Sequence, residues 1–399
     1  MKVEKLTLRN FRNIEECILV PDGHLNFLVG SNGQGKTSLI EALSYLATLR
    51  SFRGAKTEEV IQWGQPHAEI SCVLSDQDWK TEIKIVFSDG ERSSKTAFIN
   101  GKPYKSSTQF LSQRFGSFEL GFHTVVFNPS DHDLIRGEPA IRRSYLDRVL
   151  SAEDVEYLKV FQKYQRTLVQ RNALLKSDGP ISRESKDVLA GFSEPLIEYG
   201  SWIVLKRLNW IQKLNSHLNN VVHKIAPNQP DLVAFYASNW VPEFQDLSIC
   251  NNKLGSGHFT GQSPPVSLEI LVQSFRKKLS ALEGAELKTR STLVGPHRDD
   301  WTMILGGQAL KGHGSQGEVR SALLALKLSE IELFRKETGH RPLLLLDDFS
   351  SELDRERRAF LLRYLSETDL QVFVTTTEDP PYEGTRFKVA NGKAEKADP

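Results

Sequence analysis

Residues 30–37 form a glycine-rich turn that reads Gly30-Ser31-Asn32-Gly33-Gln34-Gly35-Lys36-Thr37. An apolar run at residues 25–29 precedes it, as in a buried strand, and Ile40, Leu43 and Ala47 follow at helical spacing. On such a strand-to-helix turn, backbone N–H groups and the positive helix end can bind phosphate. Lys36 would reach the β- and γ-phosphates, and the Thr37 hydroxyl would bind Mg²⁺. A hairpin turn beside an unrelated Lys-Thr pair explains fewer of these features, so the sequence predicts a nucleoside triphosphate site.

Composition narrows the class of protein. The chain has 399 residues, enough for two or three domain-sized units, and its 39% hydrophobic and 25% charged residues are ordinary for a globular protein. The net charge is +1, so a nucleic-acid-binding surface would have to be a local patch. Cys17, Cys72 and Cys250 show neither zinc-binding nor disulfide spacing. No stretch approaches the roughly 18 apolar residues of a membrane span, and the N-terminus lacks a signal-peptide core. We therefore expect a cytoplasmic protein with no membrane partner.

Periodicity divides the chain into three segments. Before about residue 130 the pattern is β-rich, with strands at 3–11, 68–75 and 81–87 and a tight turn at Asn100-Gly101. Two long helical patterns follow at 141–176 and 185–222; they form a hairpin, and the heptad spacing of the first breaks at Arg171. A further helix begins near Leu268, after an exposed loop at 251–265.

After residue 290 strands and helices alternate again. We expect a strand at 301–305, a helix at 316–336, a buried strand at 343–346, a helix at 355–365 and a strand at 371–375. Strand, helix and strand in this order imply parallel crossovers. The sequence predicts an α/β nucleotide-binding domain split between the termini, residues 1–130 and 291–399, with a helical domain inserted at 131–290.

Two further motifs carry acidic or capping residues. Asp347 and Asp348 end the buried strand, where ligands collect in such sheets. Asp347 is placed to hold Mg²⁺ and Asp348 to orient or deprotonate the attacking water, although two solvated acids at a strand end are common. The segment Gly314-Ser315-Gln316-Gly317-Glu318 contains a capping box between Ser315 and Glu318. A helix N-terminus of this kind also binds anions, so Ser315, Gly317 and Glu318 are expected to close on the nucleotide of a second subunit.

Taken in order, the phosphate loop, the Ser315 helix start, the strand ending in Asp347-Asp348 and the following Ser351-Glu352-Leu353-Asp354 resemble the ABC-type ATPase head of the SMC class. Finer matches resemble the RecF family: residues 8–13 (LRNFRN), 126–131 (VFNPSD), 142–147 (RRSYLD) and 293–300 (LVGPHRDD). The resemblance spans nearly the whole chain. It implies an ATPase using ATP and Mg²⁺, an ATP-dependent homodimer on double-stranded or gapped DNA, and help in loading recombinase at single-strand gaps with a RecR-like mediator.

Departures from the general ABC pattern qualify what the resemblance implies. Asp348 stands where many such heads have Glu, and Thr375, Thr376 or Thr377 stands where they have His. Both departures are shared by RecF-like chains and imply slow hydrolysis. The nucleotide-sensing glutamine has no assigned counterpart, residues 128–131 being the candidate region. Structural tethers of the SMC class and transporter ATPase subunits are the alternatives; an insertion of about 160 residues is short for a long coiled coil.

Basic residues near the phosphate loop form the best DNA-binding candidates. Arg50, Arg53 and Lys56 follow the first helix and have no close acid before Glu58. Phosphate contacts need only such a clustered patch. A second group at residues 136–148 is interleaved with acids and is expected to pair within the chain. For His297 and Arg298 two roles stay open, as packing partners or as nucleotide-pocket residues.

Overall fold

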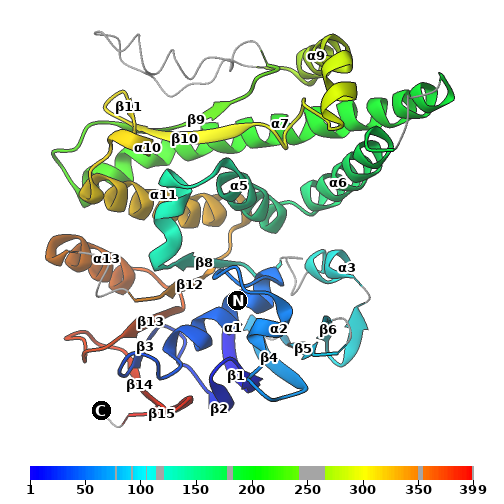
Figure 1. Ribbon diagram of the computed structural model, residues 1–399. Coiled ribbons are helices and arrows are strands. Elements are labelled where there is room, and N and C mark those ends of the chain that lie inside the picture. Colours follow the sequence, from blue (N-terminus) through cyan, green and yellow to red (C-terminus); the bar gives the residue numbers. More distant parts are fainter. Residues whose placement is uncertain are drawn as a thin grey trace. The chain divides into compact units, whose positions relative to one another are not determined.

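The computed structural model describes residues 1–76, 79–90, 93–104, 106–113, 121–177, 183–241, 266–348 and 354–397. Internal contacts divide the chain into two compact units. Unit 1 contains residues 1–131 and 330–399, and unit 2 contains residues 132–329. The chain therefore leaves unit 1, builds unit 2 and returns (Figure 1).

Unit 1 contains an antiparallel sheet in the order β2-β1-β4-β5-β6-β7. Its strands are β1 (Lys2–Phe11), β2 (Ile14–Leu19), β4 (His67–Asp76), β5 (Trp79–Ser88), β6 (Ser94–Ile99) and β7 (Lys102–Tyr104). Alternate side chains of β5, Ile83, Ile85 and Phe87, are fully buried, as the alternation predicts. Asn100 and Gly101 have φ of 49° and 77° and form the turn between β6 and β7. The predicted antiparallel pair is confirmed.

The second sheet of unit 1 has the order β15-β14-β3-β13-β12-β8. Its strands are β3 (Leu25–Val29), β8 (Thr124–Phe127), β12 (Leu343–Leu346), β13 (Val372–Thr376), β14 (Thr385–Ala390) and β15 (Lys393–Lys396). All pairings are parallel except β14 with β15. Every residue of β12 is buried, as its leucine run predicts for a central parallel strand. The split between the termini is explicit here, because β3 lies between β13 and β14.

Helix α1 (Lys36–Thr48) connects the two sheets of unit 1. Its buried Leu39 and Leu43 share one hydrophobic core with Ile70 of the antiparallel sheet and Leu345 of the parallel sheet. Figure 1 labels the helix among the strands of this unit. The unit also contains the helices α2 (Thr57–Val60), α3 (Ser107–Leu111) and α13 (Arg355–Glu367). The phosphate loop is therefore attached to a helix that is buried in the core of unit 1.

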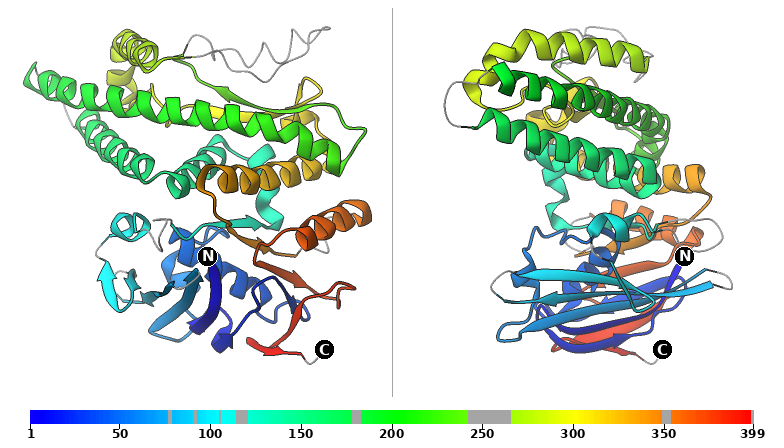
Figure 2. Two further views of the ribbon diagram at one scale, coloured as in Figure 1. Left: turned by 180° about the vertical axis from the view of Figure 1, so that it is seen from behind. Right: turned by 90° about the vertical axis from the view of Figure 1, so that its right-hand side faces the viewer.

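Unit 2 consists of helices and a small antiparallel sheet in the order β11-β10-β9. Its helices are α4 (Asp133–Arg136), α5 (Pro139–Glu153), α6 (Val155–Leu175), α7 (Arg183–Ile225), α9 (Leu268–Thr289) and α10 (Leu310–His313). Its strands are β9 (Leu232–Ala237), β10 (Asp300–Leu305) and β11 (Gln308–Ala309). Helices α6 and α7 pack side by side (Figure 2). A turn η1 (Pro129–His132) and helix α11 (Gln316–Thr338) span the two unit boundaries in sequence.

Two sequence predictions need correction in unit 2. The segment after residue 290 was expected in the nucleotide-binding domain, but β10 pairs with β9, so residues 291–329 belong to unit 2. The pattern at 141–176 is two helices, because Asp154 ends α5 and caps α6. Arg171, where the heptad spacing lacks an apolar residue, is buried and forms an ion pair with Glu286 at 2.7 Å. The predicted hairpin turn at 178–180 and the loop at 251–265 lie outside the described residues.

Candidate nucleotide-binding site

The loop at residues 30–37 requires its glycines for steric reasons. Gly35 lies at the N-cap of α1 with φ 108°, and Gly33 has φ 79°, both in the left-handed region. A Cβ on Gly30 would stand 2.2 Å from the Val389 carbonyl oxygen, so that position has no room for a side chain. The loop therefore leads directly into the N-terminus of α1, whose free N–H groups can bind an anion.

Two segments distant in sequence brace this loop. The Asn13 amide donates to the Gly33 carbonyl at 2.8 Å and accepts from the Ser38 hydroxyl at 2.8 Å. On the other side, the Gln34 side chain accepts from the Asn391 N–H at 2.7 Å, and the Gln34 carbonyl accepts from the next N–H at 3.0 Å. The loop is thus held by the β1–β2 turn and by the β14–β15 turn. In the sequence, residue 13 is recognisable only as part of a motif, and nothing predicts that residues 391–392 contact the loop.

Lys36 is folded back over the loop. Its ammonium donates to the Gly30 and Ser31 carbonyls at 2.6 and 2.9 Å. Burial lowers the pKa of Lys36, and the nearby Asp348 and Asp347 partly oppose that shift. A phosphate group would supply the missing negative charge and replace carbonyl acceptors with charged ones.

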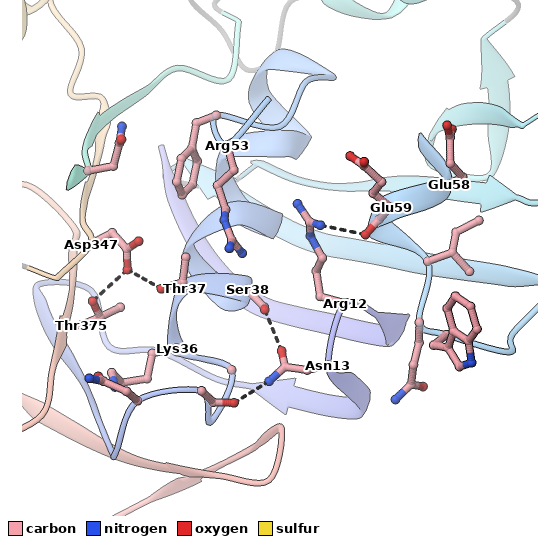
Figure 3. A pocket seen from close by; sticks show the side chains of 18 of the residues that line it. Arg12, Asn13, Lys36, Thr37, Ser38, Arg53, Glu58, Glu59, Asp347 and Thr375 are labelled. Atoms are coloured by element: carbon pink, nitrogen blue, oxygen red, sulfur yellow. Dashed lines mark hydrogen bonds between the residues drawn. The ribbon is translucent and has the colours of Figure 1, made fainter. Parts of the chain in front are cut away.

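Asp347 and Thr37 form the oxygen cluster expected to bind Mg²⁺. The Asp347 carboxylate accepts from the Thr37 hydroxyl at 2.9 Å and from the Thr375 hydroxyl at 3.0 Å (Figure 3). Burial raises the pKa of Asp347. Hard oxygen ligands suit Mg²⁺, which needs only one or two protein ligands beside phosphate and water. Among the described residues, no group of three or more His, Cys, Asp or Glu could hold a metal ion by itself.

Asp348 lies beside this cluster in an unusual conformation. Its φ is 51°, and its N–H donates to the Thr375 hydroxyl at 2.7 Å. Thr375 therefore contacts both members of the acidic pair. From the sequence, Thr375 was only one of three threonines that stand where other ABC-type heads have His. Its contact with Asp347 could not be predicted, because it depends on the pairing of β12 with β13.

A pocket of about 1470 Å³ opens over these residues. Its lining brings together Lys36, Thr37, Asp347 and Asp348, and it includes Asn128, from the region expected to hold the nucleotide sensor. Residues 58–59 and 61–66 and Asp89 also line it, and Trp63 among them is fully exposed. The space therefore extends well beyond the phosphate loop.

The remaining predicted site residues lie elsewhere. Ser315, Gly317 and Glu318 belong to unit 2, and they form the expected capping box: the Ser315 N–H donates to Glu318 at 2.7 Å and the reciprocal bond is 3.3 Å. These hydrogen bonds lower the pKa of Glu318. Asp354 caps α13, whereas Ser350, Ser351, Glu352 and Leu353 lie outside the described residues.

The basic candidates differ among themselves. Arg53 lines the pocket and approaches Glu41 at 3.7 Å. Arg50 is exposed, and the Lys56 N–H is held by Glu59 at 2.8 Å. As expected, a basic residue of the second group, Arg142, pairs within the chain, with Asp300 at 2.7 Å.

His297 and Arg298 are packing partners within unit 2. His297 contacts the Tyr164 hydroxyl at 2.6 Å and the Thr292 carbonyl at 3.1 Å, and burial lowers its pKa to about 4. Arg298 donates to the same Thr292 carbonyl. Neither lines the pocket described above. The first of the two open interpretations is therefore supported.

The fold and the loop define an ABC-type P-loop ATPase head, split between the two termini. The RecF/RecN/SMC N-terminal domain family matches residues 2–392. The DNA replication and repair protein RecF of Geotalea daltonii is 34% identical over 380 residues, covering 94% of this chain and 93% of that protein. The one from Geobacter metallireducens is 35% identical over 378 residues, covering 95% and 93%. The chain belongs to the RecF family.

Solved structures agree with this assignment. The recombination mediator protein RecF-ATP of the RecFOR pathway has a TM-score of 0.84 at 31% identity, covering 99% of this chain and 97% of that one. The Smc head domain of Pyrococcus furiosus, at 13% identity and a TM-score of 0.53, shares the fold alone. Among the described residues, no helix is long and apolar enough to cross a membrane.

Proposed function

We propose that this chain is an ATP-dependent DNA-binding protein of replication and recombinational repair. The observation that carries the proposal is the braced phosphate loop, with Lys36, Thr37 and Asp347 gathered in one pocket. Relatives named DNA replication and repair protein RecF, and RecF structures described with ATP, support it. The cofactors are ATP and Mg²⁺, with Mg²⁺ held by Thr37 and Asp347.

Hydrolysis acts in this proposal as a release step. Asp348 orients or deprotonates the attacking water, Asp347 holds the metal, and Lys36 stabilises the phosphate charge. With Asp in place of the longer Glu and no histidine after β13, hydrolysis is slow. The ATPase then sets how long a conformational state persists.

The state that ATP stabilises is a homodimer. The loop of one subunit already supplies N–H donors to the triphosphate, so a second helix N-terminus is most useful from the opposite side. Ser315 and the N–H groups at Gly317 and Glu318 of a partner subunit bind the γ-phosphate. ADP lacks that phosphate, so hydrolysis opens the dimer.

DNA is the partner held by this dimer. Arg50, Arg53 and Lys56 supply phosphate contacts without reading bases, so binding is set by salt and DNA geometry. Double-stranded DNA at gap junctions is the substrate, and a RecR-like mediator joins there to help load recombinase.

The test is sedimentation with gapped DNA, with ATP and with ADP. Lys36→Ala should lose ATP binding and dimerisation with the fold intact. Ser315→Arg should retain monomer ATP binding but lose dimerisation and ATP-dependent DNA retention, whereas Ser315→Ala controls for the lost cap. If the capping box is the only role of Ser315, both Ser315 variants dimerise normally and lose only about 1 kcal/mol of stability. A normal ATP-dependent dimer in Ser315→Arg would overturn the clamp.

A further inference from the structure

Glu41 is a buried carboxylate of α1 that the proposed mechanism does not use. Its side chain is 0% exposed. Arg12 donates to both of its oxygens, from Nε at 3.0 Å and from a terminal nitrogen at 2.6 Å. Ser51 donates to one of them as well, and Arg53 approaches the other at 3.7 Å. A buried charge needs partners of this kind, and the bidentate geometry makes Arg12 the principal one.

Arg12 is held from a second side. Its remaining terminal nitrogen donates to the Glu59 carbonyl at 2.7 Å. Its backbone, at the turn between β1 and β2, has φ 59°, a left-handed conformation that is uncommon for a residue with a side chain. The side chain is only 16% exposed, yet it lines the pocket. A guanidinium has five N–H donors, so this one still has donors for a ligand.

The position of Arg12 within the pocket indicates what it would contact. In Figure 3, Arg12 lies between Asp347 and Thr37 on one side and Glu58 and Glu59 on the other. The triphosphate end of a nucleotide is accounted for by the phosphate loop and the metal ligands. Arg12 is therefore placed for the nucleoside end, towards the part of the pocket lined by residues 58–59 and 61–66.

We propose that Glu41 is a positioning residue, which fixes Arg12 so that its free N–H groups meet acceptor atoms of the ribose or base. The inference rests on the proposed nucleotide binding and adds a role for residues outside the phosphate loop. An unrestrained arginine loses considerable rotamer freedom on binding, and the pair with Glu41 removes that cost in advance. The carboxylate also neutralises the guanidinium, which then offers directed hydrogen bonds with little added charge.

Comparing Mg·ATP with Mg·tripolyphosphate by calorimetry tests this division of the pocket. Tripolyphosphate has the phosphates but no nucleoside. Glu41→Gln and Arg12→Gln should each weaken ATP binding about tenfold and tripolyphosphate binding less than about twofold. Glu41→Asp, which keeps the charge, should recover part of the ATP affinity. Glu16→Gln breaks an exposed Arg–Glu pair, with Arg9, outside the pocket lining and should leave both affinities unchanged.

If Glu41→Gln fails to fold, Arg12→Gln still tests the proposal, because in that variant Glu41 keeps Ser51 and Arg53 as partners. Equal loss of both ligands in these variants would show a general structural role and overturn the inference, as would unchanged ATP affinity. Wild-type protein that binds tripolyphosphate but gains nothing from the nucleoside would also overturn it, while leaving the phosphate site in place. Wild-type protein that binds neither probe would instead overturn the proposed function, on which the inference depends.

Discussion

The acidic pair at the end of β12 shows how one backbone conformation separates two roles. Asp347 follows the strand directly and its carboxylate accepts from the Thr37 and Thr375 hydroxyls, whereas the backbone of Asp348 turns into the left-handed region at φ 51°. Asn and Asp adopt this conformation more readily than most residues, so an exchange between them adds little strain.

Asp348→Asn should therefore bind ATP normally but hydrolyse it roughly 100-fold more slowly, because the amide cannot act as a base. The ATP-bound dimer should persist correspondingly longer. Single-turnover hydrolysis and equilibrium ATP binding measured together check this, with Asp369→Asn, at an exposed acid outside the pocket lining, as a control. Unchanged hydrolysis would mean that another residue positions the water.

Residue-level prediction from sequence succeeded where chemistry is local. Lys36 and Thr37 follow from the loop itself, and the structure brings both into one pocket with Asp347. The hydrogen bond from Thr375 to Asp347 could not be foreseen, because it exists only through the pairing of β12 with β13. Glu41 gave no signal either, since an acid among apolar helical positions looks like a surface residue until its burial is known.

At the scale of elements, the C-terminal hairpin of β14 and β15 serves as a brace for the phosphate loop. Its turn residues Asn391 and Gly392 have φ of 49° and 74°, and both contact Gln34. A Cβ on Gly392 would stand 2.9 Å from the Asn13 carbonyl oxygen. The phosphate loop thus lies between two turns that contact each other, so a displacement of one turn also displaces the other.

Gly392→Ala should weaken ATP binding, about tenfold, because the new methyl group displaces Asn13 and with it the carbonyl of the loop. Gly339→Ala is a matched control: its φ is 72°, but nothing lies within 4 Å of the added Cβ. Both should lose about 1 kcal/mol of stability through left-handed strain. Equal ATP affinity in the two variants would contradict the brace.

Element prediction followed the same division between local and distant information. The strands at 3–11 and 343–346 and the helix after the loop were correctly predicted from periodicity. Strand β10 was also recognised, but its partner β9 was not, and so its unit was misassigned. A strand's partner is chosen by packing across the chain, which alternation alone does not encode.

At the scale of the whole molecule, the motif at residues 293–300 belongs to a buried network of hydrogen bonds and ion pairs in unit 2. Asp299 accepts from the buried Tyr236 and Trp240 side chains at 2.9 and 3.0 Å. Arg207, also buried, donates to the Pro296 carbonyl at 2.8 Å and pairs with Asp147 at 2.7 Å. Arg207 also donates to the Tyr236 hydroxyl at 3.3 Å, so this network joins α5, α7, β9 and the segment before β10. Four of the six tryptophans lie in unit 2, so fluorescence reports mainly on its unfolding.

His297 should make the stability of unit 2 depend on pH. Three arginines nearby, Arg298, Arg143 and Arg207, oppose its protonation, and burial is the largest cause of its low pKa. The neutral ring accepts from Tyr164 and donates to Thr292, which fits the two contacts. Unfolding exposes the imidazole and returns its pKa to an ordinary value near 6.5.

Between that value and the folded pKa of about 4, the unfolded chain binds the extra proton, so stability present above pH 6.5 is lost as the pH falls. The loss from pH 6.5 to 5 is about 2 kcal/mol. Asp299, whose pKa burial raises to about 7, has the opposite slope. Because Asp299 is present in both proteins, the difference in unfolding free energy between wild type and His297→Gln isolates the contribution of the imidazole. In urea unfolding followed by tryptophan fluorescence, the free energies of unfolding of the variant and of wild type should differ less at pH 5 than at pH 7.5. A difference that stays constant between these pH values would exclude His297 as the source of the pH dependence.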